Sequence, residues 1–472
     1  MKKTKIVCTL GPSTDGEDVV RSLMLNGMNI ARINVSHGTL EDHKIRIDMV
    51  KKVRKSLNLP IALLLDTKGP EIRTGKFESS NIVLETGQKF ILTTRNLIGN
   101  KKICSVTLKS LVNDISVGTK ILIDDGLIEL RADKFEKENI ICTVISGGNL
   151  SSCKGVNIPE IKTSLPFISP KDALDLKFAA EQNFDYVAAS FTRSEKDIVM
   201  LRSELKKNNC SKVKIIAKIE NLEGLKNVDD IIKVSDGIMV GRGDLGVEIP
   251  IEDIPIIQKR IVKKTTEAGK QVIIATQMLE SMIKNPRPTR AECTDVANAI
   301  YDGTSAIMLS GETASGDHPI DALKMMGKIA KRTEQEIDYK IRFKNTNIIQ
   351  KLDITSAISH AICTTAHDLS TSAIIAFTKA GKTARMISRF RPNCLIIGVT
   401  SDETILRQMN LFWGVIPVFV DKEIEDKELS DYITKISLEQ ELISKGDLVV
   451  VAASTPGGGT EDFTNLIKVH KV

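Results

Sequence analysis

The sequence predicts an α/β protein built on a (β/α)8 TIM barrel, with an inserted all-β lid domain and a C-terminal α/β open-sheet domain. Eight apolar runs of strand length alternate with helical periodicity, which is typical of βα units around a parallel sheet. The stretch 71–167 interrupts this alternation and has the period of strands alone. We therefore expect the barrel over 1–70 and 168–342, the lid over 71–167, and a regulatory C-terminal domain over 343–472.

Composition indicates a globular protein that handles small anions. The chain has 472 residues, of which 42% are hydrophobic, enough for several cores. Its net charge of +6 is spread without the dense basic blocks that nucleic-acid binding favours. No apolar run approaches the roughly 20 residues of a membrane span, and the first apolar run is too short for a signal peptide. We expect a cytoplasmic protein with neither nucleic-acid nor membrane partners.

Cysteine and histidine usage excludes several kinds of site. Eight cysteines are scattered without a Cys-x-x-Cys pair, so neither a zinc site nor a disulfide framework is indicated. Free thiols fit a reducing compartment. Only six histidines occur and no Ser-His pair is evident, which disfavours nucleophilic hydrolysis.

The barrel is predicted from the eight apolar runs. Amphipathic patterns between them, such as 194–209 and 251–269, predict helices. Eight units are the number that closes a (β/α)8 barrel, whose active site lies at the C-terminal ends of the strands. The predicted strands are 5–10, 29–35, 61–66, 186–190, 214–219, 237–242, 272–276 and 306–310.

Polar residues stand at the ends of these predicted strands, where apolar runs need a reason to carry charge. Because side chains two apart share one face of a strand, those of one strand can converge on a single pocket. The alternative for each residue alone is a rim ion pair without a role in chemistry. The residues are Arg32, Asn34, Ser36, Asp66, Lys218, Glu220, Asp244 and Thr276.

These residues favour phosphoryl transfer assisted by metal ions. Glu220 and Asp244 offer carboxylate oxygens suited to Mg²⁺, and Lys218 and Arg32 add fixed positive charge for a substrate that bears carboxylate and phosphate. Phosphoryl transfer requires positioning and positive charge rather than covalent work from the protein.

A second cation site is indicated beside the first. Asn34, Ser36, Asp66 and Thr67 combine one carboxylate with neutral oxygens. A monovalent ion suits that ligand charge better than a second divalent ion.

The lid is predicted from the alternating runs 89–94, 120–130 and 139–146, with glycine-containing turns between them. It leaves the barrel at the face that carries the site and is placed to exclude water from it. Lys154 and Asp125 are candidates for reaching the substrate; the alternatives are a solvated lysine and a turn aspartate.

The C-terminal domain is predicted from five apolar runs, the first of which ends in a small polar turn that opens a helix. Backbone N–H groups and lysines in such a turn suit a phosphate, although an ordinary strand-to-helix turn has the same composition. The candidate residues of this turn are Thr378, Lys379, Gly381, Lys382 and Thr383.

The chain resembles the pyruvate kinase family over essentially its whole length. The resemblance implies transfer of phosphate from phosphoenolpyruvate to ADP, giving pyruvate and ATP in the final step of glycolysis, with Mg²⁺ (or Mn²⁺) and K⁺ as cofactors. It also implies a homotetramer of bacterial type, without an N-terminal extension or an extra C-terminal module. The matching stretches are KIVCTLGPS, ARINVSHG, LDTKGPEIRTG, DDGLI, KGVN, KIEN, GRGDLGVE, ATQMLESMIKNPRPTRAE and MLSGETASG.

The resemblance implies roles for the residues around the reacting phosphate. Arg32 would contact that phosphate and Lys218 would stabilise it in transfer. Glu220 and Asp244 would bind Mg²⁺, Gly243 and Asp244 would lie against the substrate carboxylate, and Thr276 would lie near the face on which the enolate is protonated.

The resemblance also implies cation and nucleotide contacts. Asn34, Ser36, Asp66 and Thr67 match potassium ligands, and Glu71 is typical of potassium-dependent members. Nucleotide contacts are implied for Asn34, Val35, Ser36, His37, Arg73 and Lys154.

The C-terminal domain departs from the family pattern. The family binds a sugar-phosphate or nucleotide effector there, and the turn at Thr378 matches its phosphate loop. Glu461 and Asp462 stand where many relatives have small neutral residues, and two carboxylates near a phosphate would oppose its binding.

Two alternatives remain at this point. One is another barrel enzyme that handles an enolate with Mg²⁺, of the phosphoenolpyruvate mutase or aldolase type, which has no use for such a lid. The other is a non-catalytic metabolite sensor, against which the intact set of charged residues argues.

Overall fold

The eight predicted barrel strands form one closed parallel barrel, which confirms the predicted fold class. The computed structural model describes all residues except 1, 163, 345–352, 422–433, 436 and 454–463. The strand order around the barrel is β1-β17-β16-β15-β14-β13-β3-β2. The bounds are β1 (Lys5–Thr9), β2 (Ile30–Asn34), β3 (Ala62–Asp66), β13 (Tyr186–Ala189), β14 (Lys214–Ile219), β15 (Gly237–Gly241), β16 (Gln271–Ala275) and β17 (Ala306–Leu309).

Side chains alternate between the two faces of each barrel strand. In β3, Leu63 and Leu65 pack outward in the core beneath the helices, while Leu64 points into the barrel. The same alternation continues to the C-terminal end, where Asp66 follows Leu64 on the inner face. The register pairs Asn34 with Asp66, so both lie at the same level of the barrel.

Helices cover the outside of the barrel. Several begin at side-chain caps, such as Thr39, which accepts the N–H of Asp42. The predicted helix 251–269 is a 3-10 turn followed by a helix that begins at Ile254, because Pro255 fits only a first turn. The helices are α1 (Glu17–Leu25), α2 (Leu40–Leu57), α4 (Pro170–Glu181), α5 (Glu195–Lys207), α6 (Leu222–Lys226), α7 (Val228–Val234), α8 (Arg242–Glu248), α9 (Ile254–Glu267), α10 (Arg290–Asp302), α11 (Gly311–Ala314) and α12 (Pro319–Gln335), with the short turns η1 (Pro12–Thr14), η2 (Ile251–Asp253) and η3 (Glu280–Ile283).

The inserted lid is a curled sheet with a core of its own. Seven strands run in the order β4-β12-β8-β9-β10-β6-β7, and β11 pairs with β5 beside them. Its core includes Phe90, Leu130 and Cys142 and, among the described residues, contains none from the barrel. The bounds are β4 (Ile72–Arg73), β5 (Asn81–Leu84), β6 (Lys89–Thr93), β7 (Ile103–Ser105), α3 (Leu111–Asp114), β8 (Lys120–Ile123), β9 (Ile128–Glu136), β10 (Asn139–Ser146), β11 (Gly148–Ser151) and β12 (Gly155–Asn157).

The C-terminal domain is an open sheet in the order β20-β19-β18-β21-β22, parallel except for β22. Its helices and the barrel floor share one hydrophobic cluster, which joins Leu64 and Tyr186 of the barrel to Ile387 and Phe412. The bounds are α13 (Tyr339–Lys344), α14 (Ile354–Asp368), β18 (Ala373–Phe377), α15 (Lys382–Ser388), β19 (Leu395–Thr400), α16 (Glu403–Met409), β20 (Val415–Phe419), β21 (Leu448–Ala453) and β22 (Leu466–Lys471).

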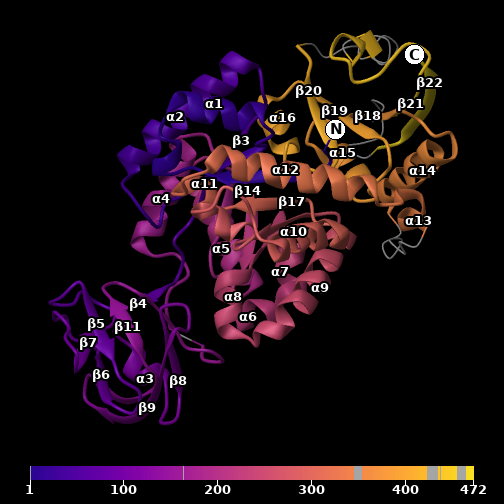
Figure 1. Ribbon diagram of the computed structural model, residues 1–472. Coiled ribbons are helices and arrows are strands. Elements are labelled where there is room, and N and C mark those ends of the chain that lie inside the picture. Colours follow the sequence, from indigo (N-terminus) through magenta and orange to yellow (C-terminus); the bar gives the residue numbers. More distant parts are fainter. Residues whose placement is uncertain (1, 163, 345–352, 422–433, 436, 454–463) are drawn as a thin grey trace.

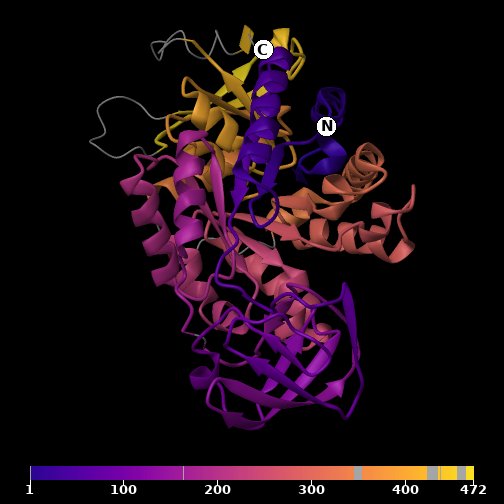
Figure 2. The same ribbon diagram turned by 90° about the vertical axis from the view of Figure 1, so that its left-hand side faces the viewer.

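The barrel separates the two other parts of the molecule. Figures 1 and 2 show the lid at one end of the barrel and the C-terminal sheet at the other. None of the helices described is both long enough and apolar enough to cross a membrane.

Candidate functional site

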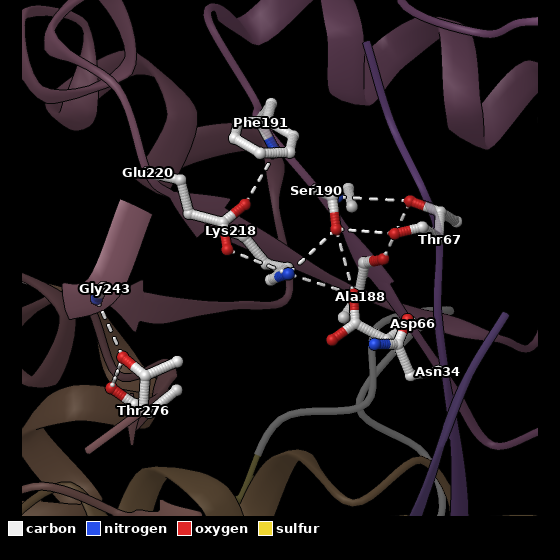
Figure 3. Close-up of polar contacts among 12 residues, drawn as sticks. Asn34, Asp66, Thr67, Ala188, Ser190, Phe191, Lys218, Glu220, Gly243 and Thr276 are labelled. Carbon is white, nitrogen blue, oxygen red and sulfur yellow. Dashed lines mark hydrogen bonds and ion pairs between the residues drawn. The ribbon is translucent and has the colours of Figure 1, made fainter. Parts of the chain in front are cut away.

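The site is centred on Lys218, the inward-facing residue near the C-terminal end of β14. Its ammonium lies 2.8 Å from Glu220 Oε1 and 3.1 Å from Asp66 Oδ1. It also donates a hydrogen bond of 2.9 Å to Ser190 Oγ (Figure 3). The side chain is only 11% exposed, so the two carboxylates and the hydroxyl hold the ammonium in one place.

Arg32 supplies a second fixed cation through the same aspartate. Its Nε donates to Asp66 Oδ2 at 2.7 Å, and its Nη1 donates to Thr9 Oγ1 at 2.8 Å. Both side chains of the Arg32–Asp66 pair are almost fully buried. The buried carboxylate of Asp66 therefore links the two cations that the sequence singled out.

Ser190 and Thr9 belong to this network and were missed by the sequence analysis. Ser190 Oγ is 3.0 Å from Asp66 Oδ1 and donates at 2.6 Å to the carbonyl of Thr67. Alternation could have found both, since Thr9 follows Val7 and Ser190 follows Ala188 on the inner face. Ser310 continues β17 in the same way, and its buried hydroxyl makes no hydrogen bond with the described residues.

Opposite charges set the ionisation of the central pair. Burial by itself would lower the pKa of Lys218, but Asp66 and Glu220 outweigh burial and raise it. Burial would likewise raise the pKa of Asp66, but Lys218 and Arg32 lower it. Both groups are therefore charged at neutral pH.

Asp244 differs from Asp66 because its neighbours include other carboxylates. Burial and then the charge of Glu220 raise the pKa of Asp244 to about 7, with smaller contributions from Asp125 and Glu71 against the opposing effect of Lys218. Asp244, Glu71 and Asp125 line a cavity of about 210 Å³ between the lid and the barrel. This concentration of negative charge is relieved by a cation.

The residues present fit a divalent ion held by two carboxylates together with substrate and water. Glu220 Oε2 accepts the N–H of Phe191 at 2.9 Å, which fixes the orientation of that carboxylate. Within the described residues, no group of three or more His, Cys, Asp and Glu side chains could hold a metal. Mg²⁺ commonly takes one or two carboxylates and completes its shell with water and phosphate oxygens, so this donor set suits it.

The four predicted potassium ligands also lie together. Asn34 Oδ1 accepts the N–H of Ser36 at 3.1 Å, and the register places Asn34 beside Asp66 (Figure 3). Thr67 continues from Asp66, with its hydroxyl 3.2 Å from the carbonyl of Ala188. The carboxylate of Asp66 is already held by Lys218 and Arg32.

Thr276 and Gly243 form a second part of the site across from Lys218 (Figure 3). The N–H of Gly243, at the start of α8, donates to Thr276 Oγ1 at 2.9 Å. Thr276 follows β16 with a φ of 65°, a left-handed conformation that is rare for a β-branched residue. The hydroxyl is thus directed at the backbone that leads into Asp244.

The predicted nucleotide residues come from two segments, the base of the lid and the loop after β2. Arg73 pairs with Glu71 at 2.8 Å and donates to the carbonyl of Cys153 at 2.7 Å. Lys154 pairs with Asp124 at 2.8 Å, so a substrate that used Lys154 would compete with that ion pair. Val35 donates its N–H to the Asp66 carbonyl, and the carbonyl of His37 bonds the ring of His43 at 2.8 Å, which fixes the loop after β2.

The predicted effector turn lies between β18 and α15, far along the chain from the barrel site. Gly381 caps α15 with a φ of 78°, which favours glycine. Thr378, Lys379 and Lys382 flank it, and the hydroxyl of Thr383 lies 2.9 Å from that of Thr464. Glu461 and Asp462, expected to oppose a phosphate here, fall outside the described residues.

Comparisons with known proteins agree with one another over the whole chain. The family model "Pyruvate kinase, barrel domain" matches residues 1–323, and "Pyruvate kinase, alpha/beta domain" matches residues 356–470. Pyruvate kinase of Clostridium acetobutylicum is 47% identical over 100% of both chains, and that of Geobacillus stearothermophilus is 46% identical over 100% of this chain and 80% of its own. A crystal structure of a pyruvate kinase from Cryptosporidium parvum superposes with a TM-score of 0.93 at 37% identity, covering 100% of this chain and 96% of the other.

Proposed function

The chain belongs to the pyruvate kinase family, and we propose that it transfers the phosphoryl group of phosphoenolpyruvate to ADP in a reaction that depends on Mg²⁺ and K⁺. The observation that carries the proposal is the buried ammonium of Lys218, held between Asp66 and Glu220 with Arg32 on the other side of Asp66. Two fixed cations beside a pair of metal-binding carboxylates match the needs of phosphoryl transfer.

In the proposed reaction, an oxygen of the ADP β-phosphate attacks phosphorus and the bond from phosphorus to the enol oxygen breaks. Arg32 and Lys218 bind the moving phosphoryl group, and Lys218 stabilises the enolate left behind. The network of Asp66 and Ser190 keeps the Lys218 ammonium charged and in place, so it needs little reorganisation during the reaction. Mg²⁺ or Mn²⁺ held by Glu220 and Asp244 would add positive charge at the substrate oxygens.

The enolate then takes a proton at carbon and becomes pyruvate. We assign Thr276 to the face on which that proton arrives, with water as a possible carrier. Gly243 and Asp244 would lie against the substrate carboxylate. The hydrogen bond from Gly243 to Thr276 fixes the two halves of this subsite relative to each other.

For the nucleotide and the monovalent cation, we assign the loop after β2 and the base of the lid. Asn34, Val35, Ser36 and His37, with Arg73 and Lys154, would bind the ADP phosphates. K⁺ held by Asn34, Ser36, Asp66 and Thr67 would add charge near the same phosphates. Glu71, which is typical of potassium-dependent members, forms an ion pair with Arg73, and this pair supports the assignment.

We further propose a cytoplasmic homotetramer with an effector site in the C-terminal domain. Ile251, Ile256 and Tyr301 are exposed on η2, α9 and α10, which contact one another, and we assign them to the surface of self-association. Thr378, Lys379, Gly381, Lys382 and Thr383 would bind the phosphate of a sugar-phosphate or nucleotide effector.

The test is pyruvate formation from phosphoenolpyruvate and ADP with Mg²⁺, first with K⁺ and then with K⁺ replaced by a bulky organic cation. We expect activity that collapses without K⁺ and without Mg²⁺. Equal activity with either monovalent cation would remove the potassium assignment alone. Absence of pyruvate under all conditions, with or without sugar phosphates, would overturn the proposed reaction in favour of a metabolite sensor.

Lys218→Met sharpens the same test, because it removes the charge and keeps much of the volume. We expect turnover to fall by about a thousandfold or more, the scale of losing one main electrostatic group, while phosphoenolpyruvate still binds. A variant with near-normal kcat would contradict the role of Lys218.

A further inference from the structure

Arg242 precedes Gly243 in the chain, and its side chain contacts the backbone of Thr276, the partner of the Gly243 N–H. It is the first residue of α8, and its side chain is only 10% exposed. Its Nη1 donates to Asp295 Oδ1 at 2.7 Å, on α10. The guanidinium is therefore buried between two elements of the barrel wall, with its charge balanced by one carboxylate.

Nη1 also donates to Gln258 Oε1 on α9 at 3.4 Å, whereas Nε and Nη2 donate to the turn that follows β16, where Nη2 also contacts Met278 Sδ. Nη2 donates to the carbonyl of Thr276 at 2.7 Å and to that of Gln277 at 3.3 Å. Nε donates to the carbonyl of Ala275 at 3.3 Å. One side chain thus binds three consecutive backbone carbonyls, which is more than local turn stabilisation requires.

That turn is held in an uncommon conformation. Thr276 and Gln277 have φ values of 65° and 54°, so two successive non-glycine residues are left-handed. For a β-branched residue such as Thr276 this conformation is strained, and it persists only where the surroundings fix it. Carbonyls 275–277 point to one side in this conformation, and Arg242 is the group that gathers them.

We infer that Arg242 is a positioning residue: by binding carbonyls 275–277 it holds Thr276 left-handed, so that the Thr276 hydroxyl faces the Gly243 N–H and the reacting carbon. The inference rests on the role proposed above for Thr276. It adds a cause for the geometry, since relaxation of the turn to ordinary φ values would rotate the hydroxyl away from Gly243.

Lysine cannot replace Arg242 in this role. Its ammonium could still pair with Asp295, but a single nitrogen cannot reach three carbonyls and the carboxylate at once, whereas the planar guanidinium presents five donors in a fixed fork. Arg242→Lys therefore keeps the buried charge and removes the multiple attachment, which separates positioning from charge balance.

The experiment is a double-mutant cycle between Arg242→Lys and Thr276→Val in the full-length enzyme with Mg²⁺ and K⁺. Two rates are measured: pyruvate formation, and incorporation of solvent deuterium into the methyl group of pyruvate in the presence of ATP. The second rate reports proton transfer at carbon directly. A general loss of structure in Arg242→Lys would not reproduce the effect of Thr276→Val on this rate.

Each single variant is expected to lower both rates by about tenfold to a hundredfold, the scale of misplacing a reacting group by about an ångström. The double variant should be no slower than the slower single variant, because both changes remove one function. Arg202→Lys is the matched control: Arg202 also binds a carbonyl and an aspartate, Val234 and Asp236, but away from the site, and should keep both rates.

Losses that multiply in the double variant would overturn the inference, as would an Arg242→Lys enzyme with unchanged rates. If Thr276→Val alone is unchanged while wild type makes pyruvate, the Thr276 assignment and this inference both fail and the overall reaction stands. If wild type makes no pyruvate, the proposed function itself fails. Should Arg242→Lys not fold, Asp295→Asn takes its place in the cycle, and multiplying losses again count against the inference.

Discussion

The lid and the C-terminal domain are attached to the same barrel in opposite ways. The C-terminal helices and the barrel floor form one hydrophobic cluster, in which Leu64 and Ile216 of the barrel are joined to Ile387 and Phe412. The core of the lid is separate, and none of the described barrel residues belongs to it. The C-terminal domain thus shares a hydrophobic core with the barrel, whereas the lid and the barrel each have their own core.

Polar contacts repeat the difference. At the floor, Arg407 pairs with Asp185 at 2.9 Å, Tyr186 donates to the Gln408 carbonyl, and Lys5 donates to the Val415 carbonyl, all in buried surroundings. At the lid, Lys162 pairs with Glu223 at 2.8 Å, with the lysine side chain 81% exposed. Arg193 of the barrel also donates to the lid carbonyl of Leu165 at 3.1 Å. The exposed Lys162–Glu223 pair contributes little to stability, so breaking that pair costs little.

This contrast places motion and rigidity where the proposed chemistry needs them. Arg73 and Lys154, proposed above as nucleotide contacts, lie in the lid, and closure of the lid over substrates would exclude water. Lys218 and Asp66 stand on strands whose lower halves are fixed by the shared core. The effector turn, on the rigidly attached side, can act on the barrel only through that floor.

The largest effect is expected from removing the lid. β4 and β12 pair Arg73 with Gly155, so a short glycine turn can join these two residues and delete 74–154. We expect turnover to fall by about a thousandfold or more, because water exclusion and the Lys154 contact are lost together. The barrel and C-terminal domain should still unfold in one transition, within a few degrees of wild type by calorimetry. Loss of that transition would show that the lid is part of the folding core.

Breaking an ion pair between the barrel and the C-terminal domain should, by contrast, lower the unfolding free energy. Arg407→Ala leaves Asp185, which is fully buried, without its ion-pair partner. Burial already raises the pKa of Asp185 against the opposing charge of Arg407. We expect a loss of about 3–5 kcal/mol in unfolding free energy, the usual cost of breaking a buried pair from one side.

Hydrogen exchange should show which parts of the molecule respond to Arg407→Ala. Amides of the barrel strands and of the C-terminal sheet are expected to lose protection together, while those of the lid keep theirs. Adding Asp185→Asn to Arg407→Ala should recover part of the lost unfolding free energy. Reduced protection in the C-terminal sheet alone would contradict a shared core.

The floor should also respond to pH. Burial, aided by the charge of Lys2, lowers the pKa of Lys5 to about 7 against the opposing effect of Glu334. Between pH 7 and the ordinary lysine pKa of about 10.4 the unfolded chain binds this proton and the folded chain does not, so stability from this group increases as pH rises. Relative to Lys5→Met, wild type should therefore gain unfolding free energy between pH 7 and pH 9.5.

An exposed lysine of the lid is the control for this shift. Lys89 is 65% exposed in its pair with Asp133, so its ammonium stays largely in water in both states. Lys89→Met should give a difference that hardly changes over the same pH range. Equal shifts for the two variants would remove the distinction between floor and lid.

Much of the fold followed from the sequence because its signals were local. All eight barrel strands were predicted within a few residues, since each is a short and largely apolar run. Lys218, Glu220, Asp66 and Arg32 came with them, because alternation puts all four on the inner face. Such positions need no knowledge of tertiary contacts.

The parts that were missed depend on contacts between distant segments. Thr9 and Ser190 are ordinary polar residues until the barrel closes and brings them to Asp66. The left-handed φ of Thr276 has no local signal, because its cause is Arg242 on the neighbouring strand connection. Alternation also could not show that Asp66 would pair with both Lys218 and Arg32, since that depends on the register between β2 and β3.

The smallest effect is expected at the lid contact itself. Lys162→Gln removes the charge that crosses from the lid to Glu223 on α6. We expect a change in unfolding free energy of less than about 1 kcal/mol, the range for exposed pairs, and a rise in the KM for ADP of less than about fivefold, since the same free energy then shifts the lid away from this orientation. Lys177→Gln is the matched control, because Lys177 pairs with Glu181 within one barrel helix and should leave KM unchanged. Raising the salt concentration should bring the KM of wild type toward that of Lys162→Gln, because exposed pairs are screened. A destabilisation as large as that of Arg407→Ala would mean that the lid is held as firmly as the floor, and the contrast between the two attachments would fall.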